Sequence, residues 1–342
     1  MTALDYLQVF GPGEEFSFRI QLLHSENSEV IAGILQHLPF ESFCLHVVVA
    51  GETIYTPFPT IASKTRNMVP RRRGTVYYNA TSQSICFCYG VVTESTPVNA
   101  FAQVFDADMG ALERLGKLVY THTIQAEAID KKIIRCGIVV PRSSMLSPTQ
   151  TLSVEPSDPV SHVNRTSSGA YDATNTFLSD QILRLRKPIE PIEIKKLRLG
   201  CVKARTGTEP AIFQSLIFLQ GFLSTLGPHV FSRLLILSHE PAMHLGLMVK
   251  QTRVFLLDTF NHFEFLADLG LDCVHRVGEL YATALDELQT LEQWRYMTDN
   301  MRTMIQLWYR WVHLIFPWYM KDGFEGRSEE EVGKMPSLEV LR

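Results

Sequence analysis

The first half of the chain alternates short apolar runs with clusters of glycine, proline, asparagine and arginine. Phe16–Leu23 shows the period of two that is typical of a half-buried strand. The other predicted strands share β-branched and aromatic side chains and are Cys44–Ala50, Thr75–Tyr78, Ser84–Val92, Val98–Phe105, Leu118–Ala126 and Lys132–Val140. The pattern predicts several strands that close a small sheet or barrel.

Two short helices are predicted between these strands. Apolar residues recur at helical spacing from Val30 to Leu38, after capping side chains at Ser25–Ser28 and before the break at Pro39. Asp106–Lys117 has an apolar stripe with Gly116 near its end, which is typical of a helix C-terminus. We therefore expect two helices to accompany the barrel.

The composition changes after Pro141. Residues 141–175 are rich in serine, threonine, proline and asparagine and poor in large aliphatic residues, which predicts a linker. Apolar residues then recur every three or four positions, in segments that prolines separate. The predicted helices are Phe177–Arg186, Glu193–Lys203, Ala211–Leu226, Val230–Ser238, a stretch within Met243–Leu266, Val274–Leu291 and Arg295–Tyr319. They predict a bundle of six or seven helices.

The fold class is therefore α+β, with a barrel followed by a helical bundle. The length of 342 residues suits two domains, each with its own core. We expect the barrel domain over residues 1–140, the linker over 141–175, the bundle over 176–325 and a loosely held, charged tail over 326–342.

Composition and charge narrow the classes of function. A net charge of -4 gives no electrostatic case for nucleic acid or a membrane surface as a partner. The N-terminus lacks the pattern of a signal peptide, and the apolar run Ala211–Leu223 is shorter than the roughly 20 residues that span a bilayer. The six cysteines include no C-x-x-C pair and are interpreted as reduced core thiols. A cytoplasmic protein is expected.

A dinucleotide-binding loop and a zinc motif are both disfavoured. The glycines of Gly11-Pro-Gly13 lack the third glycine of a dinucleotide-binding loop and precede a strand, so we expect no nicotinamide cofactor. His239 and His244 are five residues apart, and Pro241 disrupts the turn between them. Zinc motifs on helices need histidines four residues apart, so we expect no metal site there.

Several blocks of the first domain resemble one known family. The runs LPFES, LHVVVAGETIYTPFP, GTVYYN, SICFCYG and PVNAFAQV occur in the order seen in the cyclophilin-like barrel of the cucumopine synthase group, and the barrel–linker–bundle plan is also similar. The resemblance implies a condensation without a redox cofactor. Cucumopine synthase joins L-histidine to 2-oxoglutarate and closes a ring by a Pictet–Spengler reaction, and related enzymes use tryptophan. Prolyl isomerase activity is disfavoured, because Cys44-Leu-His46-Val lacks the arginine of the Phe-His-Arg motif.

Such a ring closure needs an acid, a base and cations for the substrate carboxylates. Glu52 follows a strand and a glycine, so it is a candidate base, or else an exposed turn residue. His46 lies in an apolar strand, where it is either catalytic or a hydrogen-bonded core residue. Glu94 follows the SICFCYG strand and is either a second catalytic carboxylate or a solvated loop acid.

The substrate-binding candidates are basic, aromatic and amide side chains near the same strands. One arginine of Arg71–Arg73, with Arg72 as the candidate, is expected to bind a carboxylate, because three consecutive extended residues cannot all face one pocket. Core packing and turn capping are the competing interpretations of the tyrosines and the asparagine. These further candidates are Tyr55, Tyr77, Tyr89 and Asn99. Phe87 and Tyr89 share a strand face opposite to that of Cys86 and Cys88.

The leading hypothesis is a cofactor-independent Pictet–Spengler-type cyclase for an aromatic amino acid or amine and a 2-oxo acid. Its partners would be small molecules, and the aromatic final helix suggests a bundle core or a homo-oligomer contact. Two alternatives stay open: a non-catalytic ligand-binding or assembly protein, and another cyclase or isomerase on the same scaffold.

Overall fold

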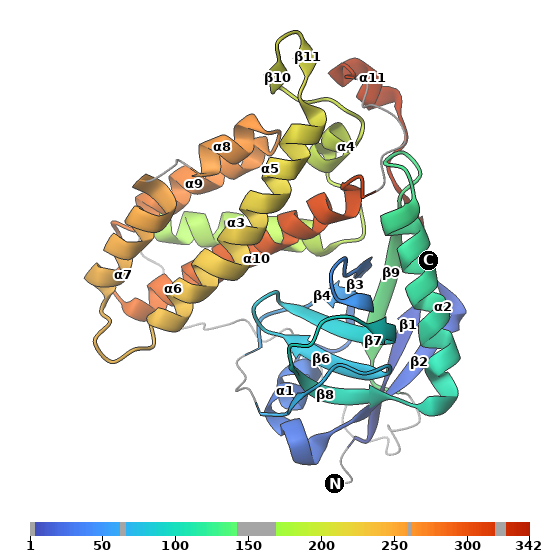
Figure 1. Ribbon diagram of the computed structural model, residues 1–342. Helices are drawn as coiled ribbons and strands as arrows, with labels where there is room; N and C mark the ends of the chain where they lie inside the picture. Colours follow the sequence, from blue (N-terminus) through green and yellow to red (C-terminus); the bar gives the residue numbers. More distant parts are fainter. Residues whose placement is uncertain (1–3, 62–65, 142–168, 259–261, 319–325) are drawn as a thin grey trace, which may run out of the picture.

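The computed structural model describes residues 4–61, 66–141, 169–258, 262–318 and 326–342. A β-barrel with two helices forms one part of the molecule, and a group of helices forms the other (Figure 1). The predicted α+β architecture is confirmed. Residues 142–168, most of the predicted linker, lie outside the described residues.

Eight of the described strands close the barrel in the order β1-β2-β8-β6-β7-β4-β3-β9, and β9 pairs again with β1. All of these pairs are antiparallel. The strands are β1 Tyr6–Gly11, β2 Gly13–Leu22, β3 Phe40–His46, β4 Gly51–Pro57, β6 Thr75–Asn79, β7 Ser84–Val92, β8 Val98–Val104 and β9 Lys132–Val139, with the short β5 Met68–Val69 beside β8. Closure leaves these eight strands without a free edge.

The two faces of the sheet have different neighbours. Phe87 and Tyr89 of β7 pack in the barrel core with residues such as Phe18, whose ring centre lies 5.6 Å from that of Phe87. Cys86 and Cys88 point the other way and pack with the side chains of the helical region. The opposite faces predicted for these pairs are confirmed, and the outer face of β7 forms the seam between the two parts.

Helices α1 (His24–Leu35) and α2 (Met109–Tyr120) add apolar side chains to the barrel core. Gly116 was predicted near a helix end, but α2 runs through it. The glycine lets the helix approach Tyr89 closely. A Cβ atom at Gly116 would lie 2.4 Å from the Tyr89 ring. The predicted strand Leu118–Ala126 was wrong: α2 extends to Tyr120, and Thr121–Gln125 continues it as a π-helical turn.

Strand limits differ from the prediction at the polar end of β3. The predicted strand Cys44–Ala50 begins earlier, at Phe40, and ends at His46. Val49 of the following loop is exposed despite its apolar side chain. Gly51 starts β4 with a positive φ of 80°, which a glycine adopts without strain. The β-branched run therefore predicted the strand, but the turn was decided by this glycine.

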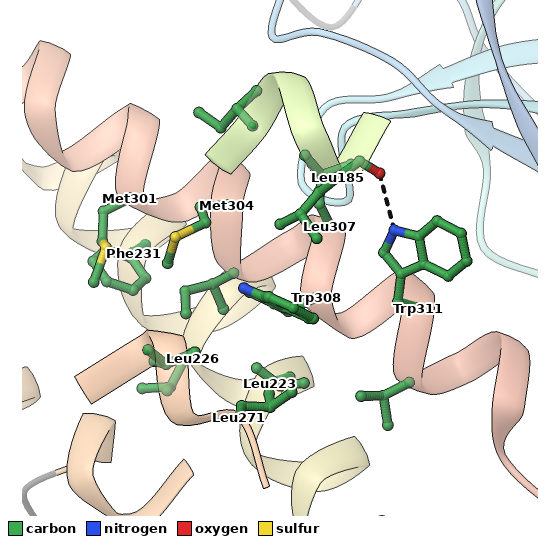
Figure 2. Close-up of a cluster of buried hydrophobic side chains, with 14 of the residues drawn as sticks. Leu185, Leu223, Leu226, Phe231, Leu271, Met301, Met304, Leu307, Trp308 and Trp311 are labelled. Atoms are coloured by element: carbon green, nitrogen blue, oxygen red, sulfur yellow. Dashed lines mark hydrogen bonds between the residues drawn. The ribbon is translucent and has the colours of Figure 1, made fainter. Parts of the chain in front are cut away.

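The helical region surrounds one long, buried helix, α10 (Leu291–Ile315). Its N-terminus carries a capping box in which Thr290 and Gln293 bond each other's backbone amides. Figure 2 shows Trp308 and Trp311 among leucines of other helices, and the Trp311 Nε1 donates to the Leu185 carbonyl at 2.9 Å. The other helices are α3 Ala170–Arg186, α4 Ile192–Arg198, α5 Ile212–Ser224, α6 Ser232–Leu237, α7 Leu245–Thr252, α8 His262–Asp268 and α9 Asp272–Ala284, with π-helical turns at Thr225–Phe231 and Arg253–Asp258 and the short β10 Arg205–Thr206 and β11 Glu209–Pro210.

Polar side chains of α10 attach the helical region to the barrel. Gln306 donates to the Thr81 carbonyl at 3.0 Å, and Arg310 donates to the Ser82 carbonyl at 2.9 Å. The His313 Nε2 lies 3.0 Å from the His46 carbonyl oxygen. These bonds fix α10 across the outer face of the sheet.

The charged tail is not loosely held, which corrects the prediction. It forms α11 (Glu329–Lys334) and β12 (Glu339–Leu341), and β12 pairs in parallel with β9 (Figure 1). Ser328 and Glu331 form a capping box at the start of α11. The tail therefore returns to the barrel. Among the helices of the described residues, none has the length and apolarity needed to span a membrane.

Candidate functional site

The predicted site residues fall into two groups on opposite faces of the sheet. His46 and Tyr89 lie in the barrel interior, and Glu52 lies beside them at the start of β4. Tyr77 lies on the outer face with Arg71 and Glu94. We call these groups the interior cluster and the seam cluster.

Hydrogen bonding and burial define the interior cluster. The His46 Nε2 lies 2.9 Å from the Tyr89 hydroxyl, and the ring centre of Tyr120 lies 5.0 Å from that of His46. Burial lowers the pKa of His46 to about 4, against a smaller opposing effect of a hydrogen bond to the Val47 backbone and of the Glu52 charge. Burial also raises the pKa of Tyr89. Both side chains are therefore neutral near pH 7, as core residues are.

Glu52 closes this cluster at the end of β7. Its Oε2 accepts a hydrogen bond from the Val91 amide at 2.5 Å. Gly90 leaves the space that the carboxylate fills, since a Cβ atom there would lie 1.9 Å from the Glu52 Oε2. Glu52 therefore ties β4 to β7 through its side chain.

The seam cluster is built around a buried guanidinium. The Arg71 side chain is 7% exposed, and its Nη2 lies 3.0 Å from the Glu94 Oε2. Nη1 donates to the Thr96 carbonyl at 2.6 Å, and Nε donates to the Tyr77 hydroxyl at 3.4 Å. The Glu94 side chain is 37% exposed. A fixed cation thus orients a carboxylate that solvent can reach.

Tyr77 supplies the aromatic surface of the seam cluster. The guanidinium carbon of Arg71 lies 5.5 Å from the Tyr77 ring centre, a distance at which the cation and the ring attract each other. Burial, with a contribution from neighbouring Cys86, raises the pKa of Tyr77, so its hydroxyl stays protonated. The phenol is therefore a neutral hydrogen-bond partner beside a charged pair.

The arginine run separates as expected, but Arg72 is not its buried member. The Arg72 side chain is exposed, and its backbone donates to the Thr75 hydroxyl at 3.2 Å and accepts from the Thr75 amide at 2.9 Å. Arg73 pairs on the surface with Glu113 at 2.7 Å. Arg71 is the arginine that the chain turns toward Tyr77. Sequence alone did not distinguish it, because the direction depends on the turn before β6.

Tyr55 and Asn99 have structural contacts in other places. Tyr55 is buried at the seam, where the guanidinium carbon of Arg310 lies 4.5 Å from its ring centre. The Asn99 Oδ1 accepts hydrogen bonds from the Asn27 side chain at 2.8 Å and from the amides of Arg66 and Asn67. Tyr55 thus helps join the two parts, and Asn99 anchors the segment that enters β5.

The chemical capacity of the two clusters follows from their charges. The interior cluster offers a neutral imidazole and phenol, whereas the seam cluster offers a guanidinium, an accessible carboxylate and a phenol. A guanidinium suits carboxylate groups, and a half-exposed carboxylate suits proton transfer. Within the described ranges, no three histidine, cysteine or acidic side chains are grouped to hold a metal ion.

The fold defines a two-part class of protein, an antiparallel β-barrel followed by a helical bundle. Residues 188–315 match the family model of the cucumopine synthase C-terminal helical bundle domain. The match lies within the helical region, and it confirms the resemblance to the cucumopine synthase group that the barrel blocks indicated. A search of curated proteins found no match.

The whole chain has a counterpart among solved structures. It is similar to McbB in a structure with tryptophan, with a TM-score of 0.76 and 21% sequence identity. The similarity covers 91% of this chain and 97% of that one. At this identity the comparison establishes the shared fold, including the way the barrel precedes the helical region.

Proposed function

We propose that the protein is a Pictet–Spengler-type cyclase that joins an aromatic amino acid or amine to a 2-oxo acid such as 2-oxoglutarate. The observation that carries the proposal is the buried Arg71 guanidinium, which holds the accessible Glu94 carboxylate beside Tyr77. The cucumopine synthase domain match and the fold shared with tryptophan-bound McbB support this class of reaction.

The reaction needs the groups that the seam cluster provides. The substrate amine adds to the keto carbon, and loss of one water gives an imine; a carbon of the aromatic ring then attacks the protonated imine. Loss of the ring proton restores aromaticity. No net oxidation occurs, so this chemistry requires no redox cofactor. Acid–base catalysis by one well-placed group contributes about 10²–10⁴-fold.

We assign a role to each residue of the seam cluster. Glu94 transfers protons during imine formation and after ring closure, since its carboxylate reaches solvent. Arg71 binds the carboxylate of the 2-oxo acid and keeps Glu94 in place. Tyr77 packs beside the substrate and offers a hydroxyl as a hydrogen-bond partner.

The direct test is product formation by the purified protein without added cofactor. It would be incubated with 2-oxoglutarate and either L-histidine or L-tryptophan, and mass spectrometry would detect the summed substrates less one water. We expect product above the spontaneous rate with at least one pair. The same rate with and without protein, for these and other aryl-ethylamines, would contradict the proposal.

A matched pair of variants tests the assigned cation. Arg71→Met removes the buried guanidinium, and Arg73→Met removes a neighbouring one that is 51% exposed. We expect Arg71→Met to lower kcat/KM by roughly tenfold or more, because a charge-assisted hydrogen bond contributes about 1.5–3 kcal/mol. Arg73→Met should change kcat/KM less than about twofold. Equal effects of the two variants would remove Arg71 from the site.

A further inference from the structure

A cavity of about 640 Å³ has its own set of lining residues, which includes no residue of the two clusters. Its walls come from the π-helical turn after α2, the loop before β9, the end of α4 and the tail segment 335–339. None of Arg71, Tyr77, Glu94, His46 or Glu52 lines it. The volume is within the range of about 300–1,000 Å³ that small-molecule sites occupy.

A buried ion pair fixes the walls of this cavity. Arg198 lines the cavity and pairs with Glu190 at 2.7 Å, with side chains only 2% and 0% exposed. Arg198 also donates to the Pro336 carbonyl, and Glu190 accepts the Leu338 amide at 2.9 Å. The two bonds attach the tail to α4 and to the segment that precedes it. Specific side-chain bonds therefore hold the cavity walls in place, and the cavity requires the folded tail.

Lys131 is the unusual residue of the cavity wall. It is 1% exposed, and its Nζ donates a hydrogen bond to the Thr123 carbonyl. Burial lowers the pKa of Lys131 to about 7, and the nearby Glu127 charge opposes this shift. A protonated amine has three hydrogens to donate, so one carbonyl leaves it incompletely satisfied.

Besides Glu127 and Arg198, the titratable groups around Lys131 are an ion pair, two histidines and one exposed carboxylate. Lys132 pairs with Glu339 at 2.8 Å. Burial, followed by the charge of Lys132, lowers the pKa of half-buried His122. Burial is the main cause that lowers the pKa of His313 in α10, and the charge of Lys131 lowers it further. Asp130 is exposed at the cavity wall.

We propose that this cavity is a second ligand site and that it takes a small organic carboxylate. Because Lys131 is 1% exposed, its ammonium turns out of the cavity wall to bind this carboxylate. Ile129 of the lining, which is 54% exposed, provides apolar surface for the organic part of such a ligand. The carboxylate supplies acceptors for the buried ammonium and compensates its charge. The site is distinct from the proposed reaction site on the seam.

Calorimetric titration of the full chain with succinate, and separately with benzoate, tests the proposal. Neither probe has an amine or a keto group, so neither can react at the seam. We expect saturable binding of at least one probe. At pH 8 the free amine is mostly neutral, and a bound carboxylate favours its charged form, so binding should take up protons. Titrations in two buffers of different ionisation enthalpy measure that uptake.

Two variants with the same substitution at adjacent lysines provide the control. Lys131→Met should weaken binding by at least about tenfold, the effect of losing a charge-assisted hydrogen bond, and should abolish proton uptake. Lys132→Met removes the lysine that pairs with Glu339 and should change the affinity less than about threefold. Thermal melting checks that both variants are folded. If Lys131→Met unfolds, Lys131→Arg takes its place. This variant keeps the charge, so it should bind the probe without proton uptake. Absent binding of both probes, or binding by wild type without proton uptake, would overturn the proposal.

Discussion

The two faces of one sheet carry polar clusters that differ in how burial is compensated. In the interior cluster His46 has a neutral phenol as its partner, and burial lowers its pKa to about 4. In the seam cluster the Arg71 side chain is 7% exposed and has a carboxylate at 3.0 Å. A buried imidazole without a close counter-ion becomes neutral, whereas a guanidinium is a far stronger base and keeps its charge, here with Glu94 as its counter-ion. Charge therefore persists at the seam, where a substrate carboxylate needs it.

The largest expected effect separates the two glutamates. Glu94→Gln removes the proposed proton-transfer group and should lower kcat by about 10²–10⁴-fold. Glu52→Gln keeps an oxygen that can accept the Val91 amide, so kcat should change by less than about threefold. The measurement is single-turnover product formation with the substrate pair that wild type accepts. If Glu52→Gln were the slower variant, the interior cluster would be the reaction site.

The next effect concerns pH and the buried imidazole of His46. Its folded-state pKa of about 4 lies below the unfolded value of about 6.5, so the unfolded chain takes up the proton first. The stability that neutral His46 provides is thus complete above about pH 6.5 and is lost as the pH falls toward 4. The expected loss is about 3 kcal/mol.

Chemical denaturation at a series of pH values measures this loss. His46→Gln should flatten the stability profile between pH 6.5 and 4, while His313, whose pKa burial lowers to about 3, leaves a residual slope. His275 is an exposed surface residue, so His275→Gln serves as the control and should keep the wild-type profile. An unchanged profile in His46→Gln would show that the imidazole does not titrate as its burial implies.

The smallest expected effect concerns two glycines. Gly90→Ala places a Cβ atom against the Glu52 carboxylate and should destabilise the fold by about 1–3 kcal/mol. Gly221→Ala, at an exposed position of α5, meets nothing within 4 Å and should stabilise it by about 0.5–1 kcal/mol. Free energies of unfolding in urea compare the two. Similar changes in the free energy of unfolding would mean that the Glu52 carboxylate does not need the space beside Gly90.

Local patterns predicted most elements of both parts. Ser84–Val92 was predicted as a strand with the limits of β7, and the helical periods after residue 176 locate α3 to α10. Two limits are wrong: α3 begins at Ala170, inside the predicted linker, and α9 ends at Ala284 and not at Leu291. The apolar residues of Leu118–Ala126 are shared between two helical turns, so a short run misled the prediction. β12 was missed because three residues of a charged tail become a strand only beside β9.

The candidate site was predicted in part. Glu94 was named from its position after a strand and Tyr77 as an aromatic binding candidate, and the structure brings them together around Arg71. Arg72 was chosen instead of Arg71. The sequence does not predict which side chain of a turn points toward the sheet. The cavity beside Lys131 was not foreseen, since its walls come from segments some 200 residues apart.

The sequence by itself determined which residues share a face. The period of two along β7 sets Phe87 and Tyr89 against Cys86 and Cys88, whatever surrounds the strand. Only the tertiary structure decided that the first pair fills the barrel while the second meets the helical region. The alternation of side chains along a strand puts neighbouring residues on opposite faces, but it does not say what packs against each face. That choice depends on strand closure and on the contacts of α10, and it leaves His46 neutral in the interior and Arg71 charged at the seam.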